Sequence, residues 1–157
     1  KTGVAQNIDI SLWDSAIAAL VNQAHNALAS GKDPQRMGSA HPNLVPYRAF
    51  QASDGWFVIG VGSDNQWARL CEHLELENHE NWHTNAGRIA DRENIESIVG
   101  EIVARYDRQT LESLLEGVPC APVNTITEAL NDQQSVARGV VTDFNGVQVL
   151  ASPLRFY

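Results

Sequence analysis

The sequence predicts an α+β fold, and three observations support this prediction. Two strand-like pairs turn at short polar-glycine steps, one at Asp54-Gly55 and one at Asn145-Gly146. Segments with helical spacing of apolar residues lie before, between and after them. The chain of 157 residues is 43% hydrophobic, enough to bury a core. Hairpins that alternate with helices are typical of a compact α+β domain.

The first 31 residues are predicted to form a strand end and then one helix. Ile8 and Ile10 alternate with polar residues, as in a strand, and Ser11 can cap a helix. Apolar residues then recur at steps of three and four, at Ile10, Trp13, Ile17, Leu20, Ala24 and Leu28. Gly31 suits the helix end, so we expect a helix of about five turns.

Residues 32–46 are predicted to be an extended linker. Pro34, Gly38, Pro42 and Pro46 fall within it, and no apolar periodicity survives. The linker separates the first helix from the rest of the chain. The apolar stripe of that helix therefore needs a partner, and we expect self-association through residues 10–28 if nothing else covers it.

Residues 47–157 are predicted to form a small α+β domain, with a hairpin at each end and helices between them. The expected elements are strands around the first turn within 47–62, helices over 64–74, from about Ala90 to 106 and over 108–117, a short strand in 120–125, a helix opened by a Thr125/Glu128 capping box, and a hairpin within 140–153. Trp56 to Val61 is apolar on both faces, so that strand is expected to be central.

Charge and composition exclude several classes of partner. The formal net charge is -8, and only two lysines occur, which argues against nucleic acid and anionic membranes. We find no signal peptide and no membrane-spanning run, so we expect a cytoplasmic protein. Cys71 and Cys120 match no metal or redox spacing and are expected to be buried thiols.

The stretch His79-Glu80-Asn81-Trp82-His83 has the spelling of a zinc-protease helix. That chemistry requires a helix, so that His79 and His83 share a metal, and it also requires a third ligand. The surrounding residues are poor helix formers, and no apolar stripe passes through them. We therefore expect a loop, with Trp82 packed against the domain, and we predict no metal site.

The loop that follows the central strand is the candidate binding site. It comprises Gly60, Gly62, Ser63, Asp64 and Asn65, and a helix begins at about Asp64. Free amides at a helix start can hold an anion or a carbonyl oxygen, and glycine allows a ligand to approach the backbone closely. The alternative is that Gly62 only permits a tight turn, with Ser63 or Asp64 as the cap.

Several phrases, in this order, resemble the class III CoA-transferases, the CaiB/BaiF family. They are "TGVAQNIDISLWDSAIAAL", "DPQRMGSAHPNLVPYRAFQASDGWFVIGVGSDNQWARLC", "HTNAGRIADRENI", "LLEGVPCAPVNTITEALNDQQSVARG" and "ASPLRF". The chain departs from the family pattern at Ala5, where a glycine is usual. The metal-like histidine stretch falls in a family connecting loop, which its Thr84, Asn85 and Arg88 match.

The resemblance implies a fold and a chemistry. Family members pair a Rossmann-like large domain with a small domain, and two subunits interlock as a homodimer. They move CoA between carboxylic acids: an aspartate attacks the acyl-CoA thioester to give a mixed anhydride, and an aspartyl-CoA thioester completes the exchange. Coenzyme A and acyl-CoA are then substrates, with no permanently bound cofactor.

The resemblance also implies that the nucleophile lies outside this chain. The family's aspartate belongs to a phrase upstream of the opening one, and neither Asp9 nor Asp14 has that context. We therefore expect a fragment that is inactive alone and contains no catalytic residue. Residues 1–31 would belong to the large domain, and residues 47–157 would form the small domain and the start of the return.

Two other functions are weighed against the transferase. Racemases of the same family carry a glutamate where this chain has Asp64, so an α-methylacyl-CoA racemase-like member is one alternative. A non-catalytic interaction module is the other. The phrase that begins at Asp64, "DNQW", favours the transferase branch.

Overall fold

The structure is a computed structural model that describes residues 3–154. Thr2 of the opening phrase, and Arg155 and Phe156 of the closing one, lie outside the described residues. The chain divides into two compact units, Lys1–Gly38 and Ser39–Tyr157, which are described separately below. The division falls within the range predicted as a linker.

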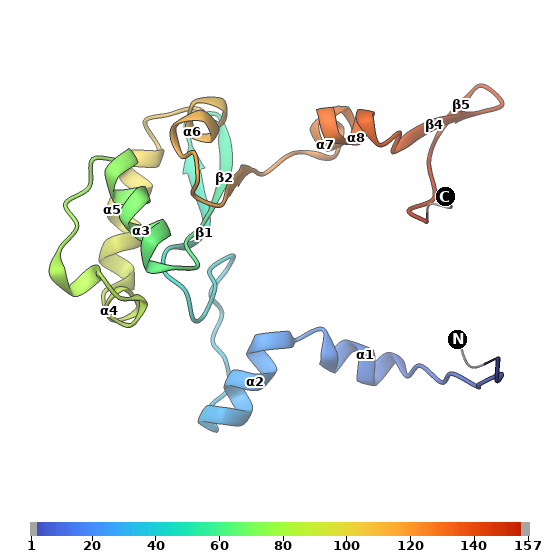
Figure 1. Ribbon diagram of the computed structural model, residues 1–157, viewed down its shortest axis with the longest axis horizontal. Coiled ribbons are helices and arrows are strands. Elements are labelled where there is room, and N and C mark those ends of the chain that lie inside the picture. Colours follow the sequence, from blue (N-terminus) through green and yellow to red (C-terminus); the bar gives the residue numbers. More distant parts are fainter. Residues whose placement is uncertain (1–2, 155–157) are drawn as a thin grey trace. The chain divides into compact units, whose positions relative to one another are not determined.

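The first unit contains two helices where one was predicted. Helix α1 spans Leu12–Ala18 and helix α2 spans Val21–Ser30 (Figure 1). The predicted ends are confirmed: the Ser11 hydroxyl accepts a hydrogen bond from the Asp14 N–H at 3.3 Å, and Gly31 takes a left-handed conformation with φ 68°. The prediction of one continuous helix was wrong, because the chain turns at Val21, whose φ is 45°.

The expected strand end before α1 is also absent from the described residues. Residues 3–11 lie in no strand. A strand needs a hydrogen-bonded neighbour, and alternation at Ile8 and Ile10 alone supplies none. None of the residues of α1 or α2 is buried.

The second unit is built on a three-stranded antiparallel sheet. Strand β1 (Tyr47–Ala52) pairs with β2 (Gly55–Gly60), and β2 pairs with β3 (Cys120–Pro122), which confirms the central place of β2. Ala52 pairs with Gly55, so the tight turn is Ser53-Asp54, one residue earlier than the sequence suggested.

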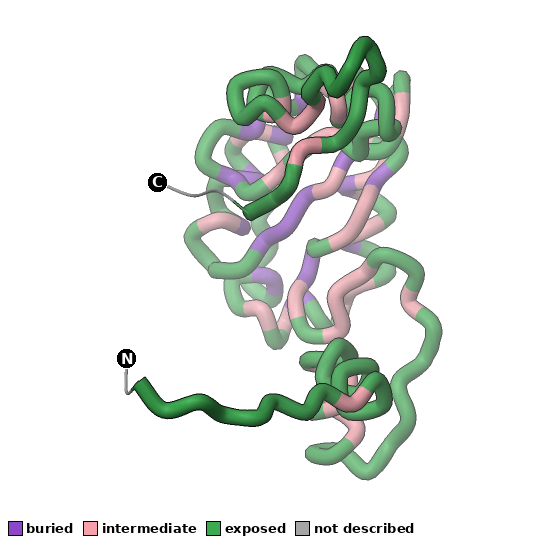
Figure 2. Tube along the Cα trace, turned by 90° about the vertical axis from the view of Figure 1, so that its right-hand side faces the viewer, coloured by how far each residue is buried: buried purple, intermediate pink, exposed green. Residues whose placement is uncertain are grey.

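Helices and the sheet enclose one hydrophobic core. They are α3 (Asp64–His73), α5 (Arg92–Val103) and α6 (Arg108–Leu114). Each buries one apolar stripe, and the largest buried side chains include Trp67 and Phe57. Figure 2 shows the buried residues gathered in this part of the chain. No residue from 119 to 154 is buried, so this core is built by residues 45–118.

The segment between α3 and α5 is more ordered than predicted. A 3₁₀ turn, η1, covers Glu80–Trp82, and helix α4 covers Asn85–Ala90. The prediction of a loop up to Ala90 was wrong from Asn85 onward. Thr84 caps α4, since its hydroxyl accepts from the Gly87 N–H at 3.2 Å. Trp82 is 5% exposed, which confirms the prediction that it packs against the domain.

The carboxy-terminal residues form two short helices and a hairpin. Helix α7 spans Ile126–Asn131, and the Thr125/Glu128 capping box that predicts it is present. A further helix that was not predicted, α8, spans Gln133–Ala137. Strands β4 (Val141–Phe144) and β5 (Val147–Leu150) pair around Asn145-Gly146, both with positive φ.

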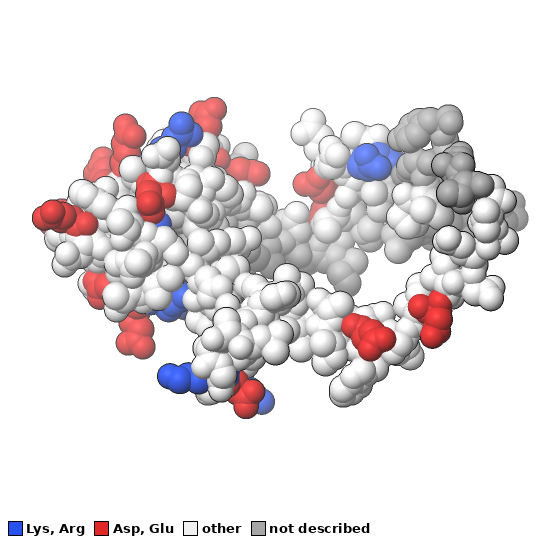
Figure 3. All heavy atoms as spheres, turned by 60° about the horizontal axis from the view of Figure 1, so that its bottom comes forward, with Lys and Arg blue, Asp and Glu red and all other residues white. Residues whose placement is uncertain are grey.

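The described residues thus confirm a mixed α+β class, with eight α-helices and two small antiparallel sheets. Within residues 3–154, no helix combines the length and the apolar character that crossing a membrane requires. Carboxylates are spread over the face shown in Figure 3, with basic groups scattered between them.

Candidate functional site

The predicted binding loop joins the central strand to α3. Strand β2 ends at Gly60, Val61 is fully buried, and the chain then emerges at Gly62. Residues 62–65 are all exposed. The sheet and the buried side of α3 therefore fix the two ends of a short loop that is open to solvent.

Gly60 and Gly62 are glycines for different reasons. A Cβ on Gly60 would lie 3.3 Å from the ring of Tyr47, so packing in the sheet accounts for Gly60. A Cβ on Gly62 would meet only the end of the Gln66 side chain, at 3.4 Å, and its φ lies outside the left-handed region. Neither packing nor backbone conformation requires glycine at position 62, which disfavours the tight-turn explanation.

The start of α3 is capped by the loop itself. The Ser63 hydroxyl accepts a hydrogen bond from the Gln66 N–H at 3.3 Å, and the Gln66 side-chain oxygen accepts from the Gly62 N–H at 2.7 Å. These contacts leave the N–H groups of Asp64 and Asn65 without an acceptor from the helix or from its cap. Two exposed donors at the positive end of a helix can bind a carbonyl oxygen or an anion.

Asp64 is tied to a buried arginine. Nη2 of Arg88, on α4, donates to Oδ1 of Asp64 at 2.9 Å. The Arg88 side chain is 0% exposed, whereas the Asp64 side chain is 57% exposed. The guanidinium also lies over the ring of Trp67, 5.4 Å from its centre.

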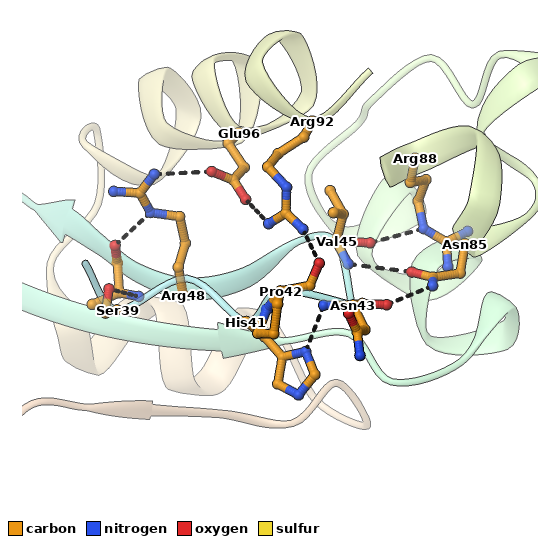
Figure 4. Close-up of polar contacts among 11 residues, drawn as sticks. Ser39, His41, Pro42, Asn43, Val45, Arg48, Asn85, Arg88, Arg92 and Glu96 are labelled. Carbon is orange, nitrogen blue, oxygen red and sulfur yellow. Dashed lines mark hydrogen bonds and ion pairs between the residues drawn. The ribbon is translucent and has the colours of Figure 1, made fainter. Parts of the chain in front are cut away.

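Arg88 also donates hydrogen bonds to two backbone carbonyls. Its Nε donates to the Val45 carbonyl oxygen at 2.8 Å, and its Nη1 donates to the Trp82 carbonyl oxygen at 2.8 Å. Figure 4 shows Arg88 and Asn85 directed at the irregular stretch before β1. The Asn85 side chain accepts from the Val45 N–H and donates to the Asn43 carbonyl oxygen.

An ion-pair cluster holds the same irregular stretch from the side of α5. Glu96 accepts from Arg48 at 2.9 Å and from Arg92 at 3.1 Å. Arg92 in turn donates to the Pro42 carbonyl oxygen at 2.9 Å (Figure 4). Residues 39–46 were predicted to be part of an extended linker, and the structure shows their backbone held by side chains of α4 and α5.

Sequence reasoning found the loop but missed Arg88 and Gln66 as its supports. Arg88 was matched to a family phrase without a role, because an arginine four residues beyond a capping threonine gives no sign of burial. Gln66 follows Gly62 by four residues, a spacing that allows its side chain to fold back on the loop. The contact of Arg88 with Asp64 could not be derived before the approach of α3 to α4 was known, whereas that of Gln66 with Gly62 is local.

The histidine stretch does not adopt the geometry of a zinc helix. His79 and His83 flank the 3₁₀ turn Glu80–Trp82. His79 packs edge-on against the Trp82 ring, with 4.5 Å between the ring centres, and Trp82 Nε1 donates to Asp91 at 2.9 Å. Within residues 3–154, no cluster of three or more histidine, cysteine, aspartate or glutamate residues could hold a metal.

The two thiols are free and are set back from solvent. Cys71 is buried on α3, and desolvation raises the pKa of its thiol to about 11, with the charge of Arg88 opposing this rise. Cys120 is only half-buried, so it is more exposed than predicted. Desolvation, and to a smaller extent the negative charge of the nearby Glu112, raise the pKa of its thiol. Neither thiol is poised as a nucleophile.

The sequence pattern of CoA-transferase family III matches residues 1–156. The chain belongs to that family. The succinate–glutarate CoA-transferase of Agrobacterium fabrum is 36% identical over 148 residues, which is 91% of this chain and 37% of that protein. The human succinyl-CoA:glutarate CoA-transferase is 32% identical over 151 residues, which is 91% of this chain and 34% of that protein.

Solved structures agree with this membership. A CaiB/BaiF family protein from Brucella suis is 42% identical, with a TM-score of 0.78 over 99% of this chain and 42% of its own. Rv3272 of Mycobacterium tuberculosis shares the fold at a TM-score of 0.79, with 17% identity. The family III chain described here spans about two fifths of the length of these relatives.

Proposed function

We propose that the full-length protein containing this family III chain is an acyl-CoA transferase that moves CoA between carboxylic acids. An aspartate outside this chain would attack the acyl-CoA thioester, so that CoA thiolate leaves and a mixed anhydride forms. The thiolate would then attack the aspartyl carbonyl, release the donor acid and leave an aspartyl-CoA thioester. The acceptor carboxylate would reverse these steps and leave with CoA.

The observation that carries this proposal is the family match over residues 1–156. The named activities of the relatives support it, because they are CoA-transferases with dicarboxylate substrates. We therefore propose short dicarboxylates, such as succinate and glutarate, as the first donor and acceptor to test. Acyl-CoA is a substrate in this scheme, and the protein holds no permanent cofactor.

We further propose that the loop of Gly60, Gly62, Ser63, Asp64 and Asn65 lies against the thioester end of acyl-CoA. Gly62 supports this role, since a Cβ there would meet only the end of the Gln66 side chain and neither packing nor backbone conformation requires a glycine. The unused N–H groups of Asp64 and Asn65 support it too. Amide donors at a helix start can bind the thioester carbonyl or the acceptor carboxylate.

The experiment is a CoA-exchange assay on the full-length protein. Succinyl-CoA is incubated with glutarate and with a panel of other carboxylates, and the acyl-CoA products are resolved by mass spectrometry. Formation of glutaryl-CoA or of another new acyl-CoA supports the proposal. Absence of any exchange, from protein that is folded, would refute it.

The same samples test the racemase alternative. A 2-methylacyl-CoA of one configuration is added in deuterated water, and exchange of its α-hydrogen is followed by mass spectrometry. Deuterium incorporation without CoA exchange would show that the protein is a racemase and not a transferase.

CoA exchange by residues 1–157 alone would contradict the further proposal that the nucleophile lies outside this chain.

A further inference from the structure

Arg88 is the one fully buried charged side chain among the described residues. Buried charges are uncommon, and those that persist are paired and hydrogen-bonded. Here the three hydrogen-bond acceptors of the guanidinium come from three different segments, and each accepts a bond at 2.8 or 2.9 Å. The planar fork of arginine fixes the directions of these bonds together.

The three partners differ in one respect. Val45 and Trp82 offer backbone carbonyls inside the domain, where an unmet acceptor would be costly. Asp64 offers a side chain that is more than half exposed and that water would solvate without help. Because the guanidinium is buried, Asp64 also compensates its charge, so this bond contributes to stability as well as to the position of the Asp64 side chain.

The bond to Asp64 acts on the candidate loop. Asp64 is the first residue of α3 and follows Gly62 and Ser63 directly. Holding its carboxylate at Arg88 fixes one side of the loop, while Gln66 fixes the other through the Gly62 N–H. The bond also pairs the negative charge of Asp64 with a cation, which reduces its repulsion of an anionic ligand at the start of α3.

We propose that Arg88 is a positioning residue, which holds the Gly60–Asn65 loop in its ligand-binding conformation through the Asp64 carboxylate. This inference rests on the proposed function of the loop. Arg88 itself touches no ligand in this scheme, because it is closed off from solvent. Its effect on acyl-CoA passes through Asp64.

The first test measures the loop without any activity. Amide hydrogen exchange is followed by mass spectrometry on the chain of 157 residues and on Asp64→Ala, Asp64→Asn and Glu72→Ala. Glu72→Ala is the matched control, since it also removes one exposed carboxylate from α3. We expect the hydrogen-bonded amides of Gly62 and Gln66 to exchange about tenfold faster in Asp64→Ala alone, because an amide oxygen in Asp64→Asn can still accept from Arg88. Equal exchange in Asp64→Ala and Glu72→Ala would overturn the inference.

The second test connects the loop to function in the full-length protein. With the acyl donor that supports exchange, Asp64→Ala should raise the acyl-CoA KM about fivefold or more at a temperature where the variant is folded, with kcat changed less. Asp64→Asn should restore most of this loss. An equal KM rise in Asp64→Asn would overturn the positioning role, because the charge itself would then act on the ligand.

The two tests separate the possible failures. If the full-length wild type transfers CoA to none of the carboxylates tested, the proposed function is refuted. The hydrogen-exchange rates of the loop amides still decide whether Arg88 positions the loop. If Arg88→Gln folds, it completes a double-mutant cycle with Asp64→Ala. Asp64→Ala should then have no further effect on loop exchange, and an undiminished effect would contradict a route through Arg88.

Discussion

Nη2 of Arg88 and Oδ1 of Asp64 lie 2.9 Å apart, with the arginine fully buried and the aspartate largely in water. The pair therefore links the interior of the domain to its candidate binding loop. The bonds that Arg88 makes inside the domain should contribute more to stability, because the carbonyls of Val45 and Trp82 both accept from the same guanidinium.

Replacing Arg88 should destabilise the domain. In Arg88→Gln the carbonyls of Val45 and Trp82 lose their donors, and the expected loss is about 2–4 kcal/mol in the free energy of unfolding. Urea unfolding followed by tryptophan fluorescence measures it. Arg105→Gln, which changes an exposed arginine on the same unit, is the matched control and should cost little. Equal midpoints for the two variants would show that the buried network is not needed.

Gly87 is required by packing, and its replacement should also destabilise the domain. A Cβ at this position would collide with the backbone carbonyl oxygen of Asn81, so the η1 turn or α4 must move. We expect Gly87→Ala to cost about 2–4 kcal/mol. Gly100→Ala should instead stabilise the domain by about 0.5–1 kcal/mol, because Gly100 lies in helix α5 and a Cβ there would make only an ordinary contact with the Phe50 ring, at 3.7 Å. Thermal unfolding of both variants checks the contrast.

The start of α7 should weaken in acid. Hydrogen bonds from Arg108 and from the Thr125 backbone lower the pKa of Glu128 from 4.5 to about 2. A lowered folded-state pKa means that the carboxylate contributes stability above pH 4.5 and loses it as the pH falls toward 2. An NMR titration of the Glu128 carboxyl carbon should give a midpoint near 2.

The Arg108 side chain supplies the control for that titration. In Arg108→Gln the ion pair at 2.9 Å is lost, and the Glu128 midpoint should rise toward 4.5. Thr125 still donates its N–H to Glu128, so part of the shift should remain. A midpoint that is the same with and without Arg108 would contradict this assignment.

The chain of 157 residues should self-associate through its first unit. Ile10, Trp13 and Leu28 are each more than 70% exposed, and burying a large apolar side chain contributes about 1.5–3 kcal/mol. Light scattering should report a dimer or larger species at tens of micromolar. The double variant Trp13→Glu plus Ile17→Glu should be monomeric. A monomeric wild type under the same conditions would contradict the prediction.

Much of the fold follows from local sequence signals. The Asn145-Gly146 turn, the Thr125/Glu128 box, the Ser11 cap and Gly31 predict where strands and helices begin and end, and the structure confirms them; the first hairpin turn lies one residue earlier than predicted. These signals work because each depends on residues that are neighbours in the chain. The candidate loop was found in the same way, from a strand, two glycines and a helix start.

The errors arise where the cause is not local. Nothing in Ala19-Leu20-Val21 marks the end of a helix, yet Val21 has a positive φ there. Helix α4 contains Asn85 and Gly87, which are poor helix formers, and is stabilised instead by the Thr84 cap and by Arg88 packed inside the domain. The support of the loop by Arg88 is of this kind, since it joins positions 24 residues apart.

The most direct test of the account is the acyl-CoA KM of Gly62→Val in the full-length protein, with Gly62→Ala and Gly100→Ala alongside it. Because a Cβ at position 62 would meet only the end of the Gln66 side chain, at 3.4 Å, the two Gly62 variants should unfold close to the wild-type temperature. If the loop lies against acyl-CoA, kcat/KM should fall about tenfold or more for valine, less for alanine, and not for Gly100→Ala. Wild-type kinetics in Gly62→Val would contradict the placement of acyl-CoA at this loop.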